Sequence, residues 1–426
     1  MLKVVDERAG REAGEGIQTL DEIALSGARL MLAKALEEEV AAYIERYTDE
    51  RDEEGRRLVV RNGVGHRARK VTCGAGTIAV KAPRVNDKRV DERGERQRFT
   101  SQILPPYMRR SPKVAEVLPV LYLRGLSTGD FKPALTALLG EDAAGLSSTN
   151  IARLTAVWED EYRAYRRRSL ADRDYVYVWA DGIHFNVRLE DDRLCTLVLI
   201  GARPDGEKEL IAIEDGYRES SESWRSVLRD LKRRGMQAPV VAVGDGALGF
   251  WKAVQDVWPE TSEQRDWCHK MANVLDKLPK RLQGKAKSLL RDAMYAETQE
   301  QAEEHIDAFA AEFSPKYDKA VTCLTKDRQA LLTFFDFPAE HWKHLRTTNV
   351  IESPFATVRL RQRVTKGAGN RTKALTMAFK LLEMAQLRWR RLDGSHLLPL
   401  VRAGATFVDG VQMERHHEET DRKEAA

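Results

Sequence analysis

The sequence predicts an α/β domain that is interrupted by an all-helical insertion and preceded by a mainly helical region containing a β-hairpin. Three patterns predict this fold class. Apolar, β-branched runs alternate with amphipathic patterns over 174–257 in the order β-β-β-α-β-α. Helical patterns alone fill 273–342, and they also dominate 112–168.

A chain of 426 residues is longer than one typical domain, so we expect several regions. They are an N-terminal helix and basic hairpin over 1–110, a helix-turn-helix-like domain over 111–172, the α/β core over 173–272 and 343–392, the all-helical insertion over 273–342, and a C-terminal tail over 393–426.

Composition excludes several classes of protein. No run of about 18 apolar residues is present and the charged N-terminus has no apolar core, so neither a membrane span nor a secretory signal is expected. The four cysteines are far apart, which is typical of a reduced cytoplasm and argues against disulfides or a Cys-rich zinc site. The net charge of +4 is too small to indicate nucleic-acid binding by itself, so that signal must come from local clusters.

The N-terminal region is predicted to hold one helix and one hairpin. The helix covers about 21–47, and the runs ARKVTC and TIAVKAP flank a Gly-containing turn at 74–76. The hairpin segment is basic and includes Arg67, Arg69 and Lys70. A solvated hairpin surface and a contact surface for DNA phosphates are both consistent with that charge.

Three helices are expected next, over about 112–123, 128–139 and 148–168. A short Gly-containing turn at 124–127 joins the first two, as in a helix-turn-helix, and Asn150 and Arg153 on the third are candidates for base contacts. An ordinary helical bundle with a basic tail is the other interpretation.

Two aspartates follow buried strands of the α/β core. The strands are expected over 175–180, 184–189, 194–200, 210–213 and 239–243, with helices over 221–234 and 247–257. Asp181 and Asp245 end the first and last of these strands, as W-A-D-G and V-G-D-G, and such strand ends open into a shared crevice. Each Asp-Gly is also compatible with a simple turn.

Two neighbouring carboxylates need a cation. At about 4 Å they repel by about 4 kcal/mol at an effective dielectric of about 20, and a divalent cation reverses the sign. Oxygen-only ligands favour Mg²⁺ or Mn²⁺.

A third carboxylate, Glu352, lies in T-T-N-V-I-E-S-P-F-A-T-V-R-L-R at the start of a helix expected over about 350–363. Arg359 lies two turns later on the same face, where a guanidinium suits a phosphate, and Arg361 and Arg363 extend the basic character. An acidic residue in the first turn is also favourable to the helix dipole alone. The following loop includes Lys366 and leads through Arg371 into a last helix over about 372–391.

The segment Arg-Asp-Trp-Cys-His-Lys places Asp266 and His269 three positions apart. A zinc site needs four ligands at known spacings, and no partners are evident here. A bare histidine such as His269 is more often structural than catalytic.

Taken together, these motifs resemble the Mutator-type bacterial insertion-sequence transposases. The resemblance rests on W-A-D-G, G-D-G, Asp-x-x-His and T-T-N-V-I-E-S, and less sharply on R-N-G-V-G-H, A-P-R-V and L-R-G-L-S-T nearer the N-terminus. It implies a ribonuclease-H-like core with a helical insertion, the acidic triad Asp181, Asp245 and Glu352, and an accessory motif at Asp266 and His269. Pro354 departs from the helix-compatible residue expected there and leaves the helix start open.

The function implied by the resemblance is metal-dependent phosphoryl transfer on DNA. The triad would hold two Mg²⁺ or Mn²⁺ ions, Arg359 would neutralise charge on the phosphate, and His269 would contact the phosphate or transfer a proton. The expected partners are double-stranded DNA, as terminal inverted repeats and target, and further copies of the chain in a dimer or higher oligomer. We expect no membrane partner, no small-molecule substrate, and a location with the nucleoid in the bacterial cytoplasm.

Three other functions stay open at this point. A nuclease of the same fold would cut without joining strands. A DNA-binding regulator would lack catalysis, although all three carboxylates are present. A carboxylate-pair glycan hydrolase would need neither a metal nor a basic surface.

Overall fold

The computed structural model describes residues 19–124, 133–134, 136, 139, 148–185, 194–246, 249–365 and 370–413. The chain forms two compact units, Met1–Leu154 and Thr155–Ala426. Among the described helices, none combines the length and the apolar character that crossing a membrane requires.

The N-terminal unit packs one helix on a small antiparallel framework. Helix α1 (Leu20–Arg46) starts at a capping box in which the Thr19 and Glu22 side chains each bind the other's backbone N–H. The predicted hairpin is confirmed as β2 (Arg69–Cys73) and β3 (Gly76–Val80), and β1 (Val59–Val64) pairs with β4 (Pro83–Asp87). A core cluster of this unit contains Leu36, Val71, Ile78, Val80 and Leu104.

Two of the three helices expected after the hairpin are present, as α2 (Pro112–Arg124) and α4 (Ser148–Arg167). The expected turn and second helix, 124–139, lie largely outside the described residues. The division between the two units falls inside α4, whereas the sequence had led us to expect a domain boundary near residue 172, after this helix. The reason is that the end of α4 packs on the α/β unit: the hydroxyls of Tyr162 and Tyr165 donate to the carbonyls of Ile213 and Leu210, each at 2.7 Å.

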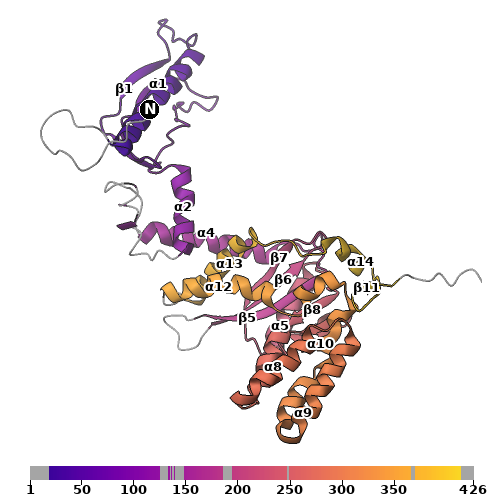
Figure 1. Cartoon of the computed structure of the whole chain (residues 1–426). Helices are drawn as coiled ribbons and strands as arrows, with labels where there is room; N and C mark the ends of the chain where they lie inside the picture. The colour runs from indigo at the N-terminus through magenta and orange to yellow at the C-terminus, as the bar shows by residue number, and fades with distance from the viewer. Residues whose placement is uncertain are drawn as a thin grey trace, which may run out of the picture. The chain divides into compact units, whose positions relative to one another are not determined.

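The second unit is built on a five-stranded mixed sheet of order β7-β6-β5-β8-β9 (Figure 1). Strands β5, β8 and β9 are parallel, while β6 is antiparallel to both of its neighbours, β5 and β7. The strands are β5 (Tyr177–Phe185), β6 (Leu194–Ala202), β7 (Lys208–Asp215), β8 (Val241–Gly244) and β9 (Ser262–Arg265).

Helices cover the sheet. Helix α5 (Ser221–Arg233) and helix α6 (Phe250–Val257) contribute Trp224, Leu228 and Phe250 to a buried cluster with Val178 and Ala180 of β5. Because side chains alternate along a strand, Tyr177, Trp179 and Asp181 point to the opposite face. Helix α12 (Asn349–Thr365) contacts β5 and β6, and helix α13 (Arg371–Gln386) contacts β7 (Figure 1).

The segment between β9 and α12 consists of helices joined by short turns and contains no strand among its described residues. It begins with α7 (Trp267–Leu275), and α8 and α9 lie against each other and project away from the sheet (Figure 1). A kink at Tyr317, two residues after Pro315, divides α9. The other elements are α8 (Lys280–Met294), α9 (Gln299–Thr325), α10 (Arg328–Leu332), η1 (Thr333–Asp336), η2 (Ala339–His341) and α11 (Trp342–Leu345).

Several predicted elements differ from the structure. The strands expected at 175–180 and 184–189 are one strand, β5, which runs through Asp181 because its pairing with β6 continues to Phe185. Strand β9 was not predicted, and neither were the short elements in the expected tail. These are η3 (Ser395–Leu397), α14 (Leu398–Arg402), β10 (Phe407–Val408) and β11 (Val411–Gln412).

Candidate active site

Asp181 and Asp245 lie side by side at one edge of the sheet. Strands β5 and β8 pair in parallel as far as Ala180 and Gly244, so the two aspartates are the next residues on neighbouring strands. Both are buried, at 4% and 6% exposed. One nitrogen of Arg218, Nη2, lies 2.6 Å from Asp245 Oδ2 and 3.5 Å from Asp181 Oδ1. Because both contacts are made by the same nitrogen, Asp181 Oδ1 and Asp245 Oδ2 lie close to each other.

The surroundings of Asp181 oppose its ionisation. Burial raises the pKa of Asp181, and the negative charge of Glu352 raises it further, whereas Arg218 and His269 lower it. Glu352, which follows Asp181 by 171 positions in the sequence, is thus part of the electrostatic surroundings of that aspartate. A cation among these carboxylates would favour the charged form of each.

Glu352 is held by the first turn of α12. The carbonyl of Thr348 accepts the backbone N–H groups of Ile351 and Glu352, each at 2.9 Å, and thereby starts the helix. Oε1 of Glu352 lies 2.9 Å from the Thr348 hydroxyl and 3.7 Å from Nε2 of His269. The side chain of Glu352 is 34% exposed, so one side of it stays open to a ligand.

The helix start, which Pro354 had left open, is Asn349, and Pro354 lies inside α12 in its second turn. A proline there removes one backbone donor from the helix. The helix nevertheless continues to Thr365, and the placement of Glu352 in the first turn is as predicted.

The carboxylate of Asp266 forms hydrogen bonds with residues at the starts of two helices, α7 and α12. Its Oδ1 accepts the backbone N–H of His269 at 2.6 Å, which makes it the N-cap of α7. Its Oδ2 accepts the hydroxyl of Thr348 at 2.6 Å and also the Thr348 backbone N–H. Although burial raises the pKa of Asp266, the hydrogen bonds from His269 and Thr348 outweigh it and hold the pKa below its usual value. The carboxylate is therefore charged and already bonded through both oxygens.

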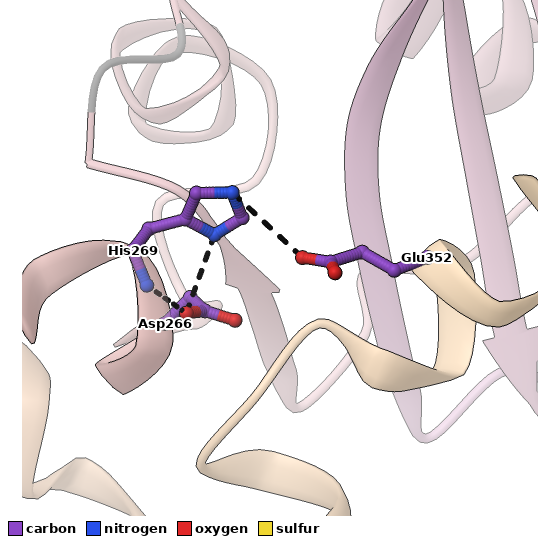
Figure 2. Close-up of side chains that lie close together, drawn as sticks. All are labelled: Asp266, His269 and Glu352. Atoms are coloured by element: carbon purple, nitrogen blue, oxygen red, sulfur yellow. Dashed lines mark hydrogen bonds and ion pairs between the residues drawn. The ribbon is translucent and has the colours of Figure 1, made fainter. Parts of the chain in front are cut away.

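His269 stands between Asp266 and Glu352 (Figure 2). Its Nδ1 lies 3.3 Å from Asp266 Oδ1, the distance of an ion pair. The Asp266 carboxylate raises the pKa of His269 to about 9 against the effect of burial, and Asp245 and Glu352 act in the same direction. In this arrangement the ring is an imidazolium at neutral pH.

Two sets of side chains could hold a metal ion. One ligand atom each of Asp266, His269 and Glu352 lie within 4.8 Å of one another (Figure 2). A metal at that place would have to displace the helix-capping bonds of Asp266 and the proton of His269. Asp181, Asp245 and Glu352 offer only carboxylate oxygens, which suit a hard divalent cation. The donor chemistry therefore fits Mg²⁺ or Mn²⁺ better at the triad.

The predicted DNA-binding residues after Glu352 have different surroundings in the structure. Arg359 and Arg363 are exposed on α12. Arg361 is buried at 3% exposed, so its predicted DNA contact is corrected: it lies three positions after buried Val358 and shares the inward face of the helix. Arg371 forms an ion pair with Asp215 at 3.0 Å. Lys366 lies outside the described residues.

The predicted DNA contacts of the N-terminal unit also differ among themselves. Arg67 and Lys70 are exposed. Arg69 is half-buried and donates to the carbonyls of Leu104 at 3.4 Å and Pro105 at 2.7 Å, so its charge also serves the fold. Asn150 and Arg153 lie on α4, and their side chains are outside the described residues.

Sequence reasoning missed Arg218 and Thr348. Arg218 sits in the short connection from β7 to α5, in G-Y-R-E-S, where no periodic pattern marks a functional residue. Thr348 belongs to the quoted T-T-N-V-I-E-S motif, and the signal available was its position as the residue just before the helix that carries Glu352.

The sequence is similar to known proteins over most of its length. A family model described as "Transposase, Mutator family" matches residues 4–391. A transposase for insertion sequence element IS6120 of Mycolicibacterium smegmatis is 57% identical over 302 residues, covering 71% of this chain and 93% of that protein. A transposase for insertion sequence element IST2 of Acidithiobacillus ferrooxidans is 46% identical over 286 residues, covering 65% and 94%. A transposase for insertion sequence element ISRM5 of Rhizobium meliloti (strain 1021) is 26% identical over 327 residues, covering 76% and 79%.

Proposed function

The chain belongs to the Mutator family of transposases, and on this basis we propose that it cuts double-stranded DNA at the terminal inverted repeats of an insertion sequence and joins the cut ends to target DNA. One observation carries the proposal. Arg218 contacts both Asp181 and Asp245, and the charge of Glu352 reaches Asp181. Two of the three proposed ligands thus lie side by side, and the third, Glu352, influences the pKa of one of them.

The proposed fold of the catalytic unit is ribonuclease-H-like. Its support is the sheet order β7-β6-β5-β8-β9, in which only β6 runs against the others. The segment between β9 and α12, which carries α8 and α9, would be the insertion. Asp181 on β5 and Asp245 directly after β8 stand on neighbouring parallel strands of this sheet.

The proposed roles follow from charge and geometry. Asp181, Asp245 and Glu352 would hold two divalent cations, which when bound supply activation of the attacking oxygen and stabilisation of the leaving oxygen. His269, as an imidazolium beside Glu352, would donate to a phosphate oxygen of the DNA. Asp266 and Thr348 are positioning residues, because their bonds end on α7, α12 and the Glu352 carboxylate.

A groove of about 540 Å³ opens beside Asp245 and offers a path for the DNA backbone. Its lining includes Gly246, the exposed side chains of Lys277, Lys319 and Lys326, and the carboxylates of Asp318 and Asp327. Exposed lysines in a groove that reaches Gly246, the residue after Asp245, suit a polyanion. We propose that phosphates flanking the cleavage point lie here.

The groove is tested by charge reversal. K319E combined with K326E should weaken binding of duplex DNA and lower the slope of log affinity against log salt by about 1 for each phosphate that the protein no longer neutralises. Reversing the charge of exposed Lys287 on α8, which does not line this groove, is the matched control. Equal effects at both places would mean that the groove has no special role.

The proposed reaction is tested on the DNA that flanks the gene. Full-length protein with Mg²⁺ and paired end fragments should yield cleaved ends and strands joined to a target plasmid, and D245N should yield neither. D256N is the control, since Asp256 is a partly exposed aspartate of α6 that pairs with Arg225. Nicks without joined products would favour a nuclease, and the same products from D245N would contradict the proposal.

A further inference from the structure

The guanidinium of Arg218 occupies the place between the two aspartates. Its Nη2 lies 2.6 Å from Asp245 Oδ2 and 3.5 Å from Asp181 Oδ1. The Arg218 side chain is only 21% exposed, and the two aspartate side chains are 9% and 6% exposed. A single positive charge therefore already compensates a pair of carboxylates that water reaches poorly.

The main chain of Arg218 is fixed. Its carbonyl accepts the indole N–H of Trp224 at 2.8 Å and the backbone N–H of Gly249 at 3.1 Å. A Cβ on Gly249 would lie 2.4 Å from the backbone of Ser220, so α6 begins in direct contact with this connection. Movement of the guanidinium must therefore come from rotation of the side chain and not from the loop.

The side chain of Arg218 is less firmly held than its backbone. Its stem crosses Gly182, where an added Cβ would lie 3.0 Å from Cγ, so a glycine at that position leaves it room. Its Nε is buried and finds no hydrogen-bond acceptor among the described residues. The carboxylates are thus the main anchors of the guanidinium, and a stronger cation can compete for them.

We propose that Arg218 is an internal counter-ion that stands in for the divalent cation. It neutralises Asp181 and Asp245 in the metal-free protein, and its guanidinium swings away from their oxygens when a metal ion binds. The inference rests on the proposed function, because it concerns the same carboxylates. The physical reason is that a guanidinium and a divalent cation compete for the same oxygen lone pairs and repel each other.

Binding of Mn²⁺ to the full-length protein tests this exchange, with free Mn²⁺ followed by electron paramagnetic resonance. R218Q should bind Mn²⁺ roughly tenfold more tightly than the wild type, because a charge-assisted hydrogen bond no longer has to break. The matched control is R225Q on α5, which removes an arginine that also has two carboxylate partners, Asp256 and Glu222, and leaves the triad untouched. Its Mn²⁺ affinity should be that of the wild type.

The outcomes separate this inference from the proposed function. If the wild type binds Mn²⁺, D181N abolishes that binding, and R218Q binds with equal or lower affinity, then the inference is wrong and the metal-binding triad stands. If D181N binds Mn²⁺ as the wild type does, the triad assignment fails together with the inference.

A second measurement covers the case in which R218Q folds poorly. R218K keeps a positive charge on a more compact head group, and it should bind Mn²⁺ with an affinity between those of the wild type and R218Q. Without metal, urea unfolding should show R218Q less stable than the wild type, and the difference should shrink when D245N removes one of the two repelling charges. Additive effects of R218Q and D245N would contradict the role of counter-ion.

Discussion

Replacing Thr348 with valine removes one hydroxyl and keeps the shape of the side chain. In the folded protein this hydroxyl lies 2.6 Å from Asp266 Oδ2 and 2.9 Å from Glu352 Oε1, and Thr348 is fully buried. A hydroxyl has one hydrogen, so it donates to one of the two carboxylates at a time. The shorter contact indicates Asp266 as the main acceptor, with Glu352 held against the same oxygen.

The size of the effect follows from these contacts. A hydrogen bond to a charged group contributes about 1.5–3 kcal/mol, and Asp266 is too buried for water to replace the donor. We therefore expect T348V to lower the free energy of unfolding by about 1.5–3 kcal/mol. Because Glu352 also loses its support, we expect DNA cleavage to slow by roughly 10–100-fold, the range seen when a partner of a metal ligand is removed.

The assay compares T348V with two other variants. Urea unfolding gives the stability, and single-turnover cleavage of an end fragment gives the rate separately from DNA affinity. T348S keeps the hydroxyl and should cleave at nearly the wild-type rate. T376V removes the hydroxyl of another buried threonine, which bonds the Thr372 carbonyl at 2.7 Å on α13, and should leave cleavage unchanged.

A T348V protein with the expected decrease in stability and a wild-type cleavage rate would overturn this prediction. Thr348 would then join the two helix starts without positioning Glu352. Weaker DNA binding with an unchanged rate would equally contradict a role at the reacting phosphate.

Two further predictions concern the framework. G201A should lower the free energy of unfolding by about 1–3 kcal/mol, since its Cβ would lie 2.5 Å from Ile211 Cδ1. The control G284A, on α8 with nothing within 4 Å of the added Cβ, should be neutral or slightly stabilising. Equal decreases in the free energy of unfolding, measured with urea, would contradict the packing argument. Burial raises the pKa of Asp87, but hydrogen bonds from Arg89 and others outweigh it and hold the pKa below its usual 3.8. The stability that the charged Asp87 contributes is present above pH 3.8 and is lost as pH falls through the pKa of the folded state. Amide exchange in the N-terminal unit of the wild type should therefore become faster in acid, and that of D87N should change less. The same acid dependence in both proteins would contradict this prediction.

Much of the fold could be predicted because its elements are strongly patterned. The apolar run before Asp181, the amphipathic face of α5 and the Gly-containing hairpin turn each determine a local structure with few alternatives. Strand β9 could not be predicted, because Ser-Glu-Gln-Arg has no apolar residue and becomes a strand only by pairing with β8. Asp181 was expected to end a strand, but β5 continues past it. Its pairing with β8 ends just before Asp181, whereas its pairing with β6 continues to Phe185.

The candidate site shows a similar division. The three carboxylates could be named from sequence because each stands beside a recognisable strand or helix start. Arg218 could not, since its role depends on a connection folding over Gly182 toward residues far away in the chain. The roles of Asp266 and Arg361 also depend on tertiary structure. Asp266 is the N-cap of α7, and Arg361 lies on the buried face of α12.

The position of a bound divalent cation decides between the two sets of candidate ligands. A crystal of the protein soaked in Mn²⁺, measured with anomalous scattering, would locate the ion. We predict a peak about 2 Å from carboxylate oxygens of Asp181, Asp245 and Glu352, with the Arg218 guanidinium turned away from it. A peak coordinated instead by Asp266 and His269, or none near the two aspartates, would contradict the assignment of the triad.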